Sequence, residues 1–300
     1  MSASPRTTVT ILEAAAGASL AAAFLHAHLY TPLLFWPLAS LAMSAAVVAA
    51  LSPLAVSRRM TFLAHSQGHT VLTAALAAAV PTAIFAGSLA SPLFYLFTFV
   101  FMILLNLLVP VAEMLGLRRD VATGVVMSLQ YVIILALLYV IRHFYAAAVD
   151  PLLLIIGEYV LITWRDVLTQ IPLLLLAALF PAAYGIKYLY ASVDENFARA
   201  VGVRVSTLDR LFIVSMSLAA AASVYAAGSL MPAILLVLPG AIAARYSHRL
   251  TEQIPLSVSV AAISTAVSHF LYTALPWLWP SAALGLVLLA FLLAAPRRRE

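Results

Sequence analysis

Residues 91–110 read SPLFYLFTFVFMILLNLLVP, twenty residues without an aspartate, glutamate, lysine or arginine. An apolar helix of about 20 residues is long enough to cross the hydrocarbon core of a bilayer. The rest of the 300-residue chain is similar, since 65% of it is hydrophobic and 9% is charged, with a mean hydropathy of +1.08. A soluble domain averages about 25% charged residues and cannot hide so much apolar surface from water. The sequence therefore predicts a membrane protein.

Apolar stretches like this one follow each other along the whole chain. The polar and apolar alternation of an outer-membrane barrel is absent, so we predict an all-α, polytopic fold with about eight to ten transmembrane helices. The number stays open because short half-helices in the closely spaced pairs have the hydropathy of full spans. The predicted spans are 8–30, 33–57, 60–83, 91–110, 121–145, 166–190, 206–224, 227–247, 255–274 and 279–296.

Two stretches need separate interpretation. Residues 8–30 are too long for the apolar part of a secretory signal and are followed at once by another span, so we interpret them as a retained helix. Residues 146–165 are apolar but interrupted by charges, which favours a short re-entrant or interfacial piece on the outer face.

If successive spans cross the membrane in alternating directions, most of the basic residues fall on one side of it. The positive-inside rule places the richer side in the cytoplasm, which predicts a multi-pass protein of a prokaryotic plasma membrane with both termini cytoplasmic. The excess of 16 basic over 11 acidic residues is then topological and indicates no nucleic-acid partner. The opposite side receives Arg142 and Arg165, whereas the cytoplasmic side receives Arg6, Arg58, Arg59, Arg118, Arg119, Arg199, Arg204, Arg245, Arg249 and Arg297 to Arg299.

Several catalytic motifs are missing from the sequence. The only lysine, Lys187, is followed by Tyr188, so no phosphate-binding GxxxxGK[ST] loop is present. HExxH and GxSxG motifs are also absent, and the chain has no cysteine for disulfides or thiolate metal sites. Most carboxylates lie in loops or at span ends, unlike the buried acid pairs of a proton-driven carrier. These absences favour a non-catalytic chain: if the protein transports a solute, it takes its energy from a partner, which favours a transporter subunit over a self-sufficient pump.

The polar stretch 192–202 is predicted to form a short cytoplasmic helix. Ser192 and Glu195 have the S-x-x-E spacing of a capping box, and Gly202 can end the helix in a left-handed conformation. The helix presents Phe197 as an apolar anchor, together with the small residues Ala198 and Ala200. Such a helix suits docking in a groove of another protein.

Four separated patterns, in order over residues 33–296, resemble the permeases of zinc, manganese and iron ABC importers (the ABC-3 type). The family coupling loop, roughly S-F-D-x-x-x-A-x-A-x-G, is similar to the stretch with Ser192, Asp194, Ala198, Ala200 and Gly202. The R-x-M-S-F-x-G-D-A-L-S-H-A pattern resembles residues 58–70. The two other patterns are similar to residues 150–166 and to the stretch with Ala227, Gly228, Leu235, Leu236, Pro239, Ala241 and Ala243.

This resemblance implies a type II importer-like permease fold. It divides the chain into an extra N-terminal transmembrane helix over 1–32 and a metal-permease domain over 33–300, with a coupling helix at about 192–202. It also implies a homodimer, a cytoplasmic ATP-binding subunit that hydrolyses the ATP, and an extracellular metal-binding protein. The transported divalent metal is then cargo, with no permanently bound cofactor.

His65 and His69 are the candidate metal pathway. They lie four residues apart on one predicted helix, so both imidazoles face the same side, within the hydrocarbon depth. Ionisable residues there are costly and usually functional, and imidazole suits Zn and similar ions. The family pattern carries Asp and His at these places, both implied to contact metal, so the histidine at 65 makes the pair more zinc-like. The alternative is two buried histidines bonded to backbone carbonyls or to each other.

Other polar residues have weaker functional interpretations. His269 is a possible external gate or an interfacial histidine, and His26 and His28 are candidates for collecting metal outside. Asp120 is predicted to cap the helix over 121–145. The outward-facing acids are expected to receive the binding protein or to be solvated: Asp150, Glu158 and Asp166.

The sequence leaves two other functions open. A permease for haem, cobalamin or iron-siderophore would need a wide apolar chamber without ligating histidines. A secondary metal carrier would work without an ATPase. We favour zinc or manganese as the cargo of an ATP-driven importer.

Overall fold

The computed structural model describes residues 5–87, 89, 91–145, 150–157, 159–247 and 249–295, of which residues 5–8 and 225–226 are described without their side chains. Every regular element in these ranges is helical. The elements are α1 (Pro5–Tyr30), η1 (Pro32–Leu34), α2 (Phe35–Ser57), α3 (Thr61–Ala86), α4 (Pro92–Met114), α5 (Arg119–Phe144), α6 (Pro151–Ile156), η2 (Tyr159–Leu161), α7 (Trp164–Val193), α8 (Glu195–Ala200), α9 (Val205–Ala227), α10 (Leu230–Leu235), α11 (Leu238–Tyr246), α12 (Leu250–Ala274) and α13 (Pro280–Ala294).

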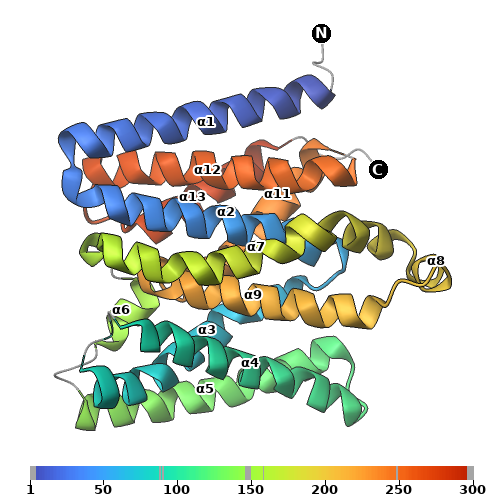
Figure 1. Ribbon diagram of the computed structural model, residues 1–300, viewed down its shortest axis with the longest axis horizontal. Coiled ribbons are helices and arrows are strands. Elements are labelled where there is room, and N and C mark those ends of the chain that lie inside the picture. The colour runs from blue at the N-terminus through green and yellow to red at the C-terminus, as the bar shows by residue number, and fades with distance from the viewer. Residues whose placement is uncertain are drawn as a thin grey trace.

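The long helices run side by side along the longest axis of the molecule (Figure 1). Within the described ranges, eight helices are long and apolar enough to cross a membrane. This confirms the predicted polytopic all-α fold. The other two predicted spans are shorter: residues 227–247 contain the two short helices α10 and α11, and the stretch 279–296 contains the 15-residue α13.

The interruption between α10 and α11 has a local cause. Leu236 caps the end of α10, and the next helix begins at Leu238 with Pro239 in its first turn. Proline lacks a backbone N–H and fits the start of a helix, where that group would have no partner. The apolar character of the stretch is continuous across this break, so hydropathy alone does not show it.

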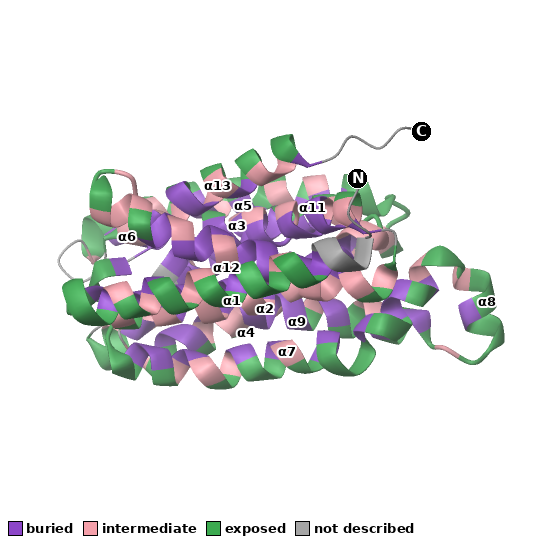
Figure 2. Cartoon of the chain, turned by 90° about the horizontal axis from the view of Figure 1, so that it is seen from above, coloured by how far each residue is buried: buried purple, intermediate pink, exposed green. Residues whose placement is uncertain are grey.

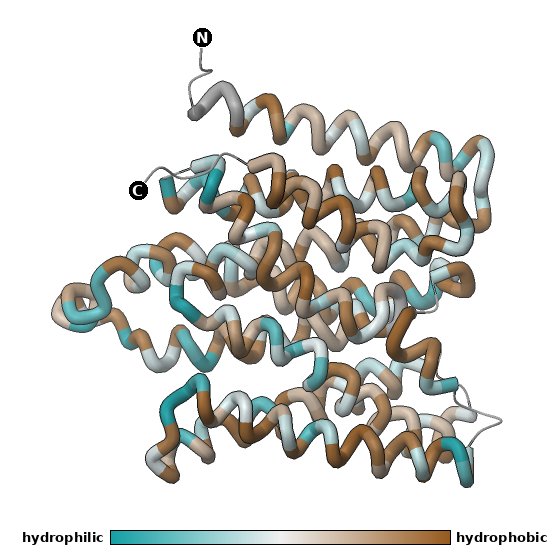
Figure 3. Tube along the Cα trace, turned by 180° about the vertical axis from the view of Figure 1, so that it is seen from behind, coloured by the Kyte–Doolittle hydropathy of each residue, from teal (hydrophilic) through white to brown (hydrophobic). Residues whose placement is uncertain are grey.

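The two ends of the bundle differ. The start of α1, the end of α13 and the short helix α8 lie at one end, whereas α6 lies at the other (Figure 1). Hydrophilic residues gather at the α8 end (Figure 3). Because successive long helices alternate in direction, the arginine-rich corners α2–α3 and α4–α5 fall at this end. Residues 297–299, which also entered the topology prediction, lie outside the described residues.

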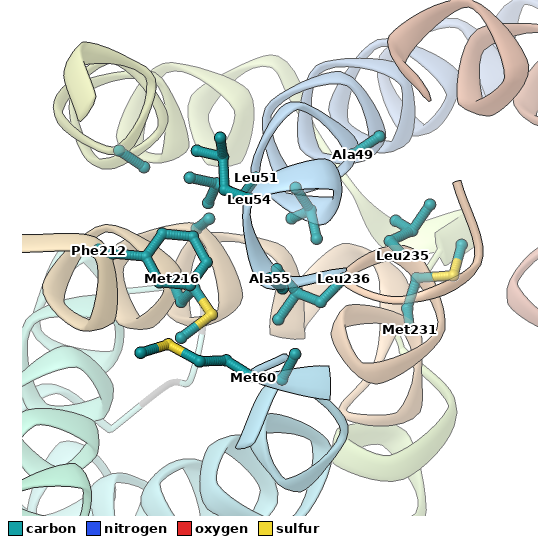
Figure 4. Close-up of a cluster of buried hydrophobic side chains, with 14 of the residues drawn as sticks. Ala49, Leu51, Leu54, Ala55, Met60, Phe212, Met216, Met231, Leu235 and Leu236 are labelled. Atoms are coloured by element: carbon teal, nitrogen blue, oxygen red, sulfur yellow. The ribbon is translucent and has the colours of Figure 1, made fainter. Parts of the chain in front are cut away.

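Two hydrophobic clusters form the core. The larger one joins α2, α9, α10 and the start of α3 around Met60, Phe212 and Leu235 (Figure 4). The second joins α4, α5 and the outer half of α3 with part of α9, around Phe94 and Met102. The start and the outer half of α3 thus belong to different packed bodies.

Two glycines allow close approach of the backbone near the broken helix. A Cβ on Gly240 in α11 would lie 2.6 Å from the carbonyl carbon of Ser52 in α2. Gly228 has a positive φ of 73°, and a Cβ there would lie 2.3 Å from the carbonyl oxygen of Ile155. The next N–H, of Ser229, donates to the carbonyl of Leu154 in α6 at 3.1 Å. The short α6 is therefore held against the end of the bundle; its place at the membrane surface stays a prediction, and residues 146–149 of that stretch lie outside the described residues.

Candidate functional site

The short helix α8 projects beyond the bundle at its polar end (Figure 2). Asp194 is its N-cap and accepts a hydrogen bond from the backbone N–H of Phe197 at 2.9 Å. At the other end Gly202 has φ +85°, and its N–H donates to the carbonyl of Arg199. The predicted helix between two spans is therefore present, and its left-handed terminator is Gly202.

The predicted capping box at Ser192 is wrong. Ser192 lies in the last turn of α7, and its hydroxyl donates to the carbonyl of Leu189 at 2.5 Å. The Glu195 carboxylate does not turn back to cap; it pairs with Arg58 and Arg199. The helix α7 continues to Val193, so the capping position moves two residues along the chain to Asp194.

The two faces of α8 have different surroundings. Ala198 is buried against Ala191 of α7 and Val205 of α9, so its small side chain lets α8 pack on the bundle. Phe197 is 65% exposed, and Ala200 is exposed as well. The outward surface of α8 is thus an aromatic ring beside a small residue.

Arg58 connects α8 to the bundle. This arginine follows the last residue of α2, and its side chain is 9% exposed. Its guanidinium donates to Glu195 of α8 at 3.1 Å and to both carboxylate oxygens of Asp209 of α9 at 3.1 and 3.2 Å. The guanidinium carbon also lies 5.5 Å from the ring centroid of Tyr188 in α7. Four segments of the chain meet at this side chain.

The charges in this cluster stabilise each other. Burial alone would lower the pKa of Arg58, but the neighbouring carboxylates, Asp209 above all, outweigh it and raise the pKa. Burial alone would raise the pKa of Glu195, but its hydrogen bonds and ion pairs with Arg58 and Arg199 lower it overall. Arg58 and Glu195 are therefore both charged at neutral pH. In the sequence Arg58 stands out for its part in the topology and as the first residue of the pattern at 58–70, but its partners lie 137 and 151 residues away and give no local signal.

His65 and His69, here called the histidine pair, lie on one face of α3. Their ring centroids are 6.4 Å apart, His65 is exposed, and His69 is partly buried. Nε2 of His69 lies 3.2 Å from the hydroxyl of Tyr131 in α5. At 1.5 Å rise per residue the two histidines lie roughly 6 and 12 Å from the first residue of α3, so they are inside the span.

Buried amides fix the rotation of α3 about its axis. On the face away from the histidine pair, Gln67 exchanges hydrogen bonds of 3.0 and 3.1 Å with Asn106 of α4. On the side of α5, the amide of Gln130 donates to Thr70 at 3.0 Å. An unpaired polar group in an apolar interior is costly, so these bonds resist rotation of the helix. They keep the histidine pair on the outer surface of the α3–α5 layer.

Metal-ligating side chains are sparse in the described part of the chain. No group of three or more histidine, cysteine, aspartate or glutamate residues is close enough there to hold a metal ion. One chain therefore offers two imidazoles, with the Tyr131 hydroxyl beside them. A cation in transit would complete its coordination with water or with groups from another subunit.

His269 is fully buried between α12 and α1. Its Nε2 lies 3.2 Å from Nδ1 of His26, and His26 also contacts the rings of Tyr30 and Phe270. His28 is exposed and lies apart from this pair, near Phe35. The contact of His26 with His269 attaches α1 to α12; a role of His269 as an external gate stays a prediction.

The remaining acidic candidates mostly act as helix caps. The predicted cap at Asp120 is wrong, because α5 begins earlier: its N-cap position is Arg118, with no side-chain cap hydrogen bond, and Asp120 lies in the first turn, paired with Arg118. Asp150 caps α6, accepting from the N–H of Leu152. Asp166 is buried and accepts from the N–H and hydroxyl of Thr163, so it is neither solvated nor open to a partner. Residue 158 lies outside the described residues.

Comparisons with known proteins give a family and a fold. The sequence profile of the ABC 3 transport family matches residues 31–296, which leaves α1 outside the match. A search of curated proteins found no match. Among solved structures, the chain is similar to PsaBC from Streptococcus pneumoniae in complex with Fab, at 19% identity and a TM-score of 0.75, covering 91% of this chain and 94% of that one. It is also similar to a metal-chelate type ABC transporter in an inward-facing conformation, at 15% identity and a TM-score of 0.70, covering 98% and 100%.

Proposed function

The chain belongs to the ABC 3 transport family, and we propose that it is the permease subunit of an ATP-driven importer for a divalent transition metal, zinc or manganese. In this proposal it hydrolyses no ATP itself. A cytoplasmic ATP-binding subunit supplies the energy, and an extracellular metal-binding protein delivers the ion.

The observation that carries the proposal is the capped helix α8 at the arginine-rich end. A six-residue helix is marginal by itself in water, yet here it is held by Asp194, by Gly202 and by the packing of Ala198. Phe197 on this helix is 65% exposed. A rigid, projecting aromatic side chain outside the bundle supports docking of a cytoplasmic partner.

The histidine pair supports a bare metal ion as the cargo. Neutral imidazole binds zinc and other transition metals, and the spacing of His65 and His69 places both rings on one face of α3. A carrier of haem or cobalamin would have no need of two ligating groups at that depth. The chain has no cysteine, so no thiolate competes with imidazole as a metal ligand.

The exposure of His65 also supports a homodimer. An imidazole facing lipid inside the hydrocarbon region is costly, and such groups usually face a protein interior or a water-filled path. Covering the α3–α5 layer with a second copy would remove His65 from lipid and bring two histidine pairs together. Four imidazoles would then satisfy the usual coordination number of zinc.

Reconstitution with a candidate ATPase and binding protein tests the proposal. Metal uptake into vesicles is expected to require ATP and to fail when Asp194 and Phe197 are both replaced by alanine, because the ATPase then meets a less ordered helix without its exposed aromatic ring. Uptake driven by a proton gradient without ATP would refute the importer and favour a secondary carrier.

The cargo and the path are tested separately. His69→Ala should abolish uptake while the ATPase still copurifies, and unchanged uptake would remove the histidine pair from the path. Competition between zinc and manganese for uptake identifies the preferred metal. Transport of haem or a siderophore by this chain, with no metal uptake, would contradict the cargo assignment.

A further inference from the structure

Arg58 occupies the joint between α8 and the helix that carries the histidine pair. It follows α2 directly, and Met60, two residues further on, is the N-cap of α3. His65 is the seventh residue after Arg58. On its other side the guanidinium reaches Glu195, the first residue of α8.

The two carboxylate contacts of Arg58 differ in their surroundings. Asp209 is 13% exposed and, besides its two hydrogen bonds from Arg58, accepts one from the hydroxyl of Tyr188 at 2.7 Å, so this half is an internal anchor. The Glu195 side chain is 39% exposed and belongs to the projecting α8. One planar guanidinium with five donors can hold both carboxylates at once, whereas a lysine ammonium presents a single point charge.

The other attachments of α8 lead away from α3. Ala198 packs against α7 and α9, and the chain enters and leaves α8 through these same two helices. Toward the α2–α3 corner, the polar contact described for α8 is the ion pair of Glu195 with Arg58. A displacement of α8 thus reaches the start of α3 most directly through this pair.

We propose that Arg58 is a positioning residue that transmits movement of α8 to the start of α3, and so to the histidine pair. The inference rests on the proposed function, since it assumes that an ATPase moves α8. Asp209 and Tyr188 hold the guanidinium in place, and Glu195 provides the connection that carries the displacement. Breaking the Glu195 connection leaves both the ATPase surface and the metal ligands in place but separates their movements.

The first test measures coupling in the reconstituted complex. Glu195→Gln is expected to keep ATPase association and ATP hydrolysis but to reduce metal ions transported per ATP roughly tenfold, the effect of losing one contact between charged groups. Arg199→Gln is the matched control, because it removes the other, exposed partner of Glu195 and should leave this ratio unchanged. Arg58→Gln should behave as Glu195→Gln does. If Arg58→Gln fails to fold, Glu195→Gln, which leaves the pair of Arg58 with Asp209 intact, still decides the question.

The second test follows the movement itself. The chain has no cysteine, so cysteines introduced as Asn196→Cys in α8 and Phe62→Cys in α3 are the sole sites that take a spin label. Pulsed EPR then measures the distance between the two labels in nucleotide-free and ATP-trapped complexes. With Glu195 present, the two labels should keep their separation because α8 and α3 move together. With Glu195→Gln, the separation should change between the two states.

The outcomes separate the two proposals. A parent complex without ATP-dependent uptake refutes the proposed function and the inference with it. A parent complex that transports, together with a Glu195→Gln complex that has the same transport ratio and the same label separations, refutes the role of Arg58 alone.

Discussion

The N-cap of α8 allows a prediction with a calculable size. Asp194→Ala removes the carboxylate that accepts the N–H of Phe197 at 2.9 Å. Loss of such a cap costs about 1 kcal/mol, which corresponds to about a fivefold change in the ratio of open to closed helix. Because α8 has only six residues, no distant turn of helix compensates. Backbone amides of residues 195–200 are therefore expected to exchange with deuterium about five times faster.

Hydrogen exchange followed by mass spectrometry on the protein in lipid nanodiscs measures this effect. Asp194→Asn is the matched control, because asparagine caps a helix about as well as aspartate and should leave exchange near the parent value. Ser192→Ala should also have no effect, since its hydroxyl bonds within α7. Faster exchange in Ser192→Ala, or none in Asp194→Ala, would refute the assignment of the cap. The affinity of the ATPase for Asp194→Ala should fall by up to about fivefold, as the binding-competent population falls.

Three further predictions concern packing, charge and the metal path. Gly240→Ala places a Cβ 2.6 Å from the backbone of Ser52 and should cost about 3 kcal/mol, seen as a lower melting temperature in detergent, whereas Gly17→Ala, with open space around it, should not. Because ion pairs lower the pKa of Glu195 below its ordinary 4.5, its contribution to holding α8 should be complete above pH 4.5 and be lost as the pH falls through the lowered value. This loss would appear as faster amide hydrogen exchange in α8, after correction for the intrinsic exchange rate at each pH. The effect should be absent in Glu195→Gln. Tyr131→Phe, which removes the hydroxyl beside the histidine pair, should raise the metal concentration for half-maximal uptake about tenfold, and an unchanged uptake curve would exclude that hydroxyl from the path.

The helical membrane fold could be predicted because hydropathy reports the solvent of each segment directly. Eight of the ten predicted stretches are helices long enough to span. Hydropathy does not report whether backbone hydrogen bonds are continuous, which is why residues 227–247 resembled one span and are α10 and α11. The proline that starts α11 was visible, but prolines also occur inside the long helices, for example Pro53 in α2.

The local prediction at α8 shows how overlapping signals compete. Ser192 and Asp194 can both act as caps, and the sequence gives each a plausible partner three residues on. The deciding factor is where α7 ends, and this depends on packing against α9 and on Ala198 of α8, which packs against Ala191 of α7. Short-range spacing therefore predicted that a capped helix exists, but not which residue caps it.

The Arg58 cluster could not be predicted from local spacing, because its partners come from α7, α8 and α9. The positive-inside rule explains why an arginine lies at position 58, but it says nothing about which side chains this arginine contacts. The structure adds that the Arg58 side chain is almost completely buried. A buried guanidinium needs carboxylates around it, and the fold supplies one from a fixed helix and one from a projecting helix.

The packing indicates where the subunit can change shape. Gly240 binds α11 closely to α2, and Gly228 does the same for the end of α9 and α6, so these helices have little freedom to slide. By contrast, α3 begins in one hydrophobic cluster and ends in the other. A rotation of the α3–α5 layer against the rest would turn about the start of α3, which is where Arg58 lies. Under the proposed role of Arg58, a displacement of α8 would act close to this pivot and would move the histidine pair, roughly 10 Å along the helix, by a larger distance.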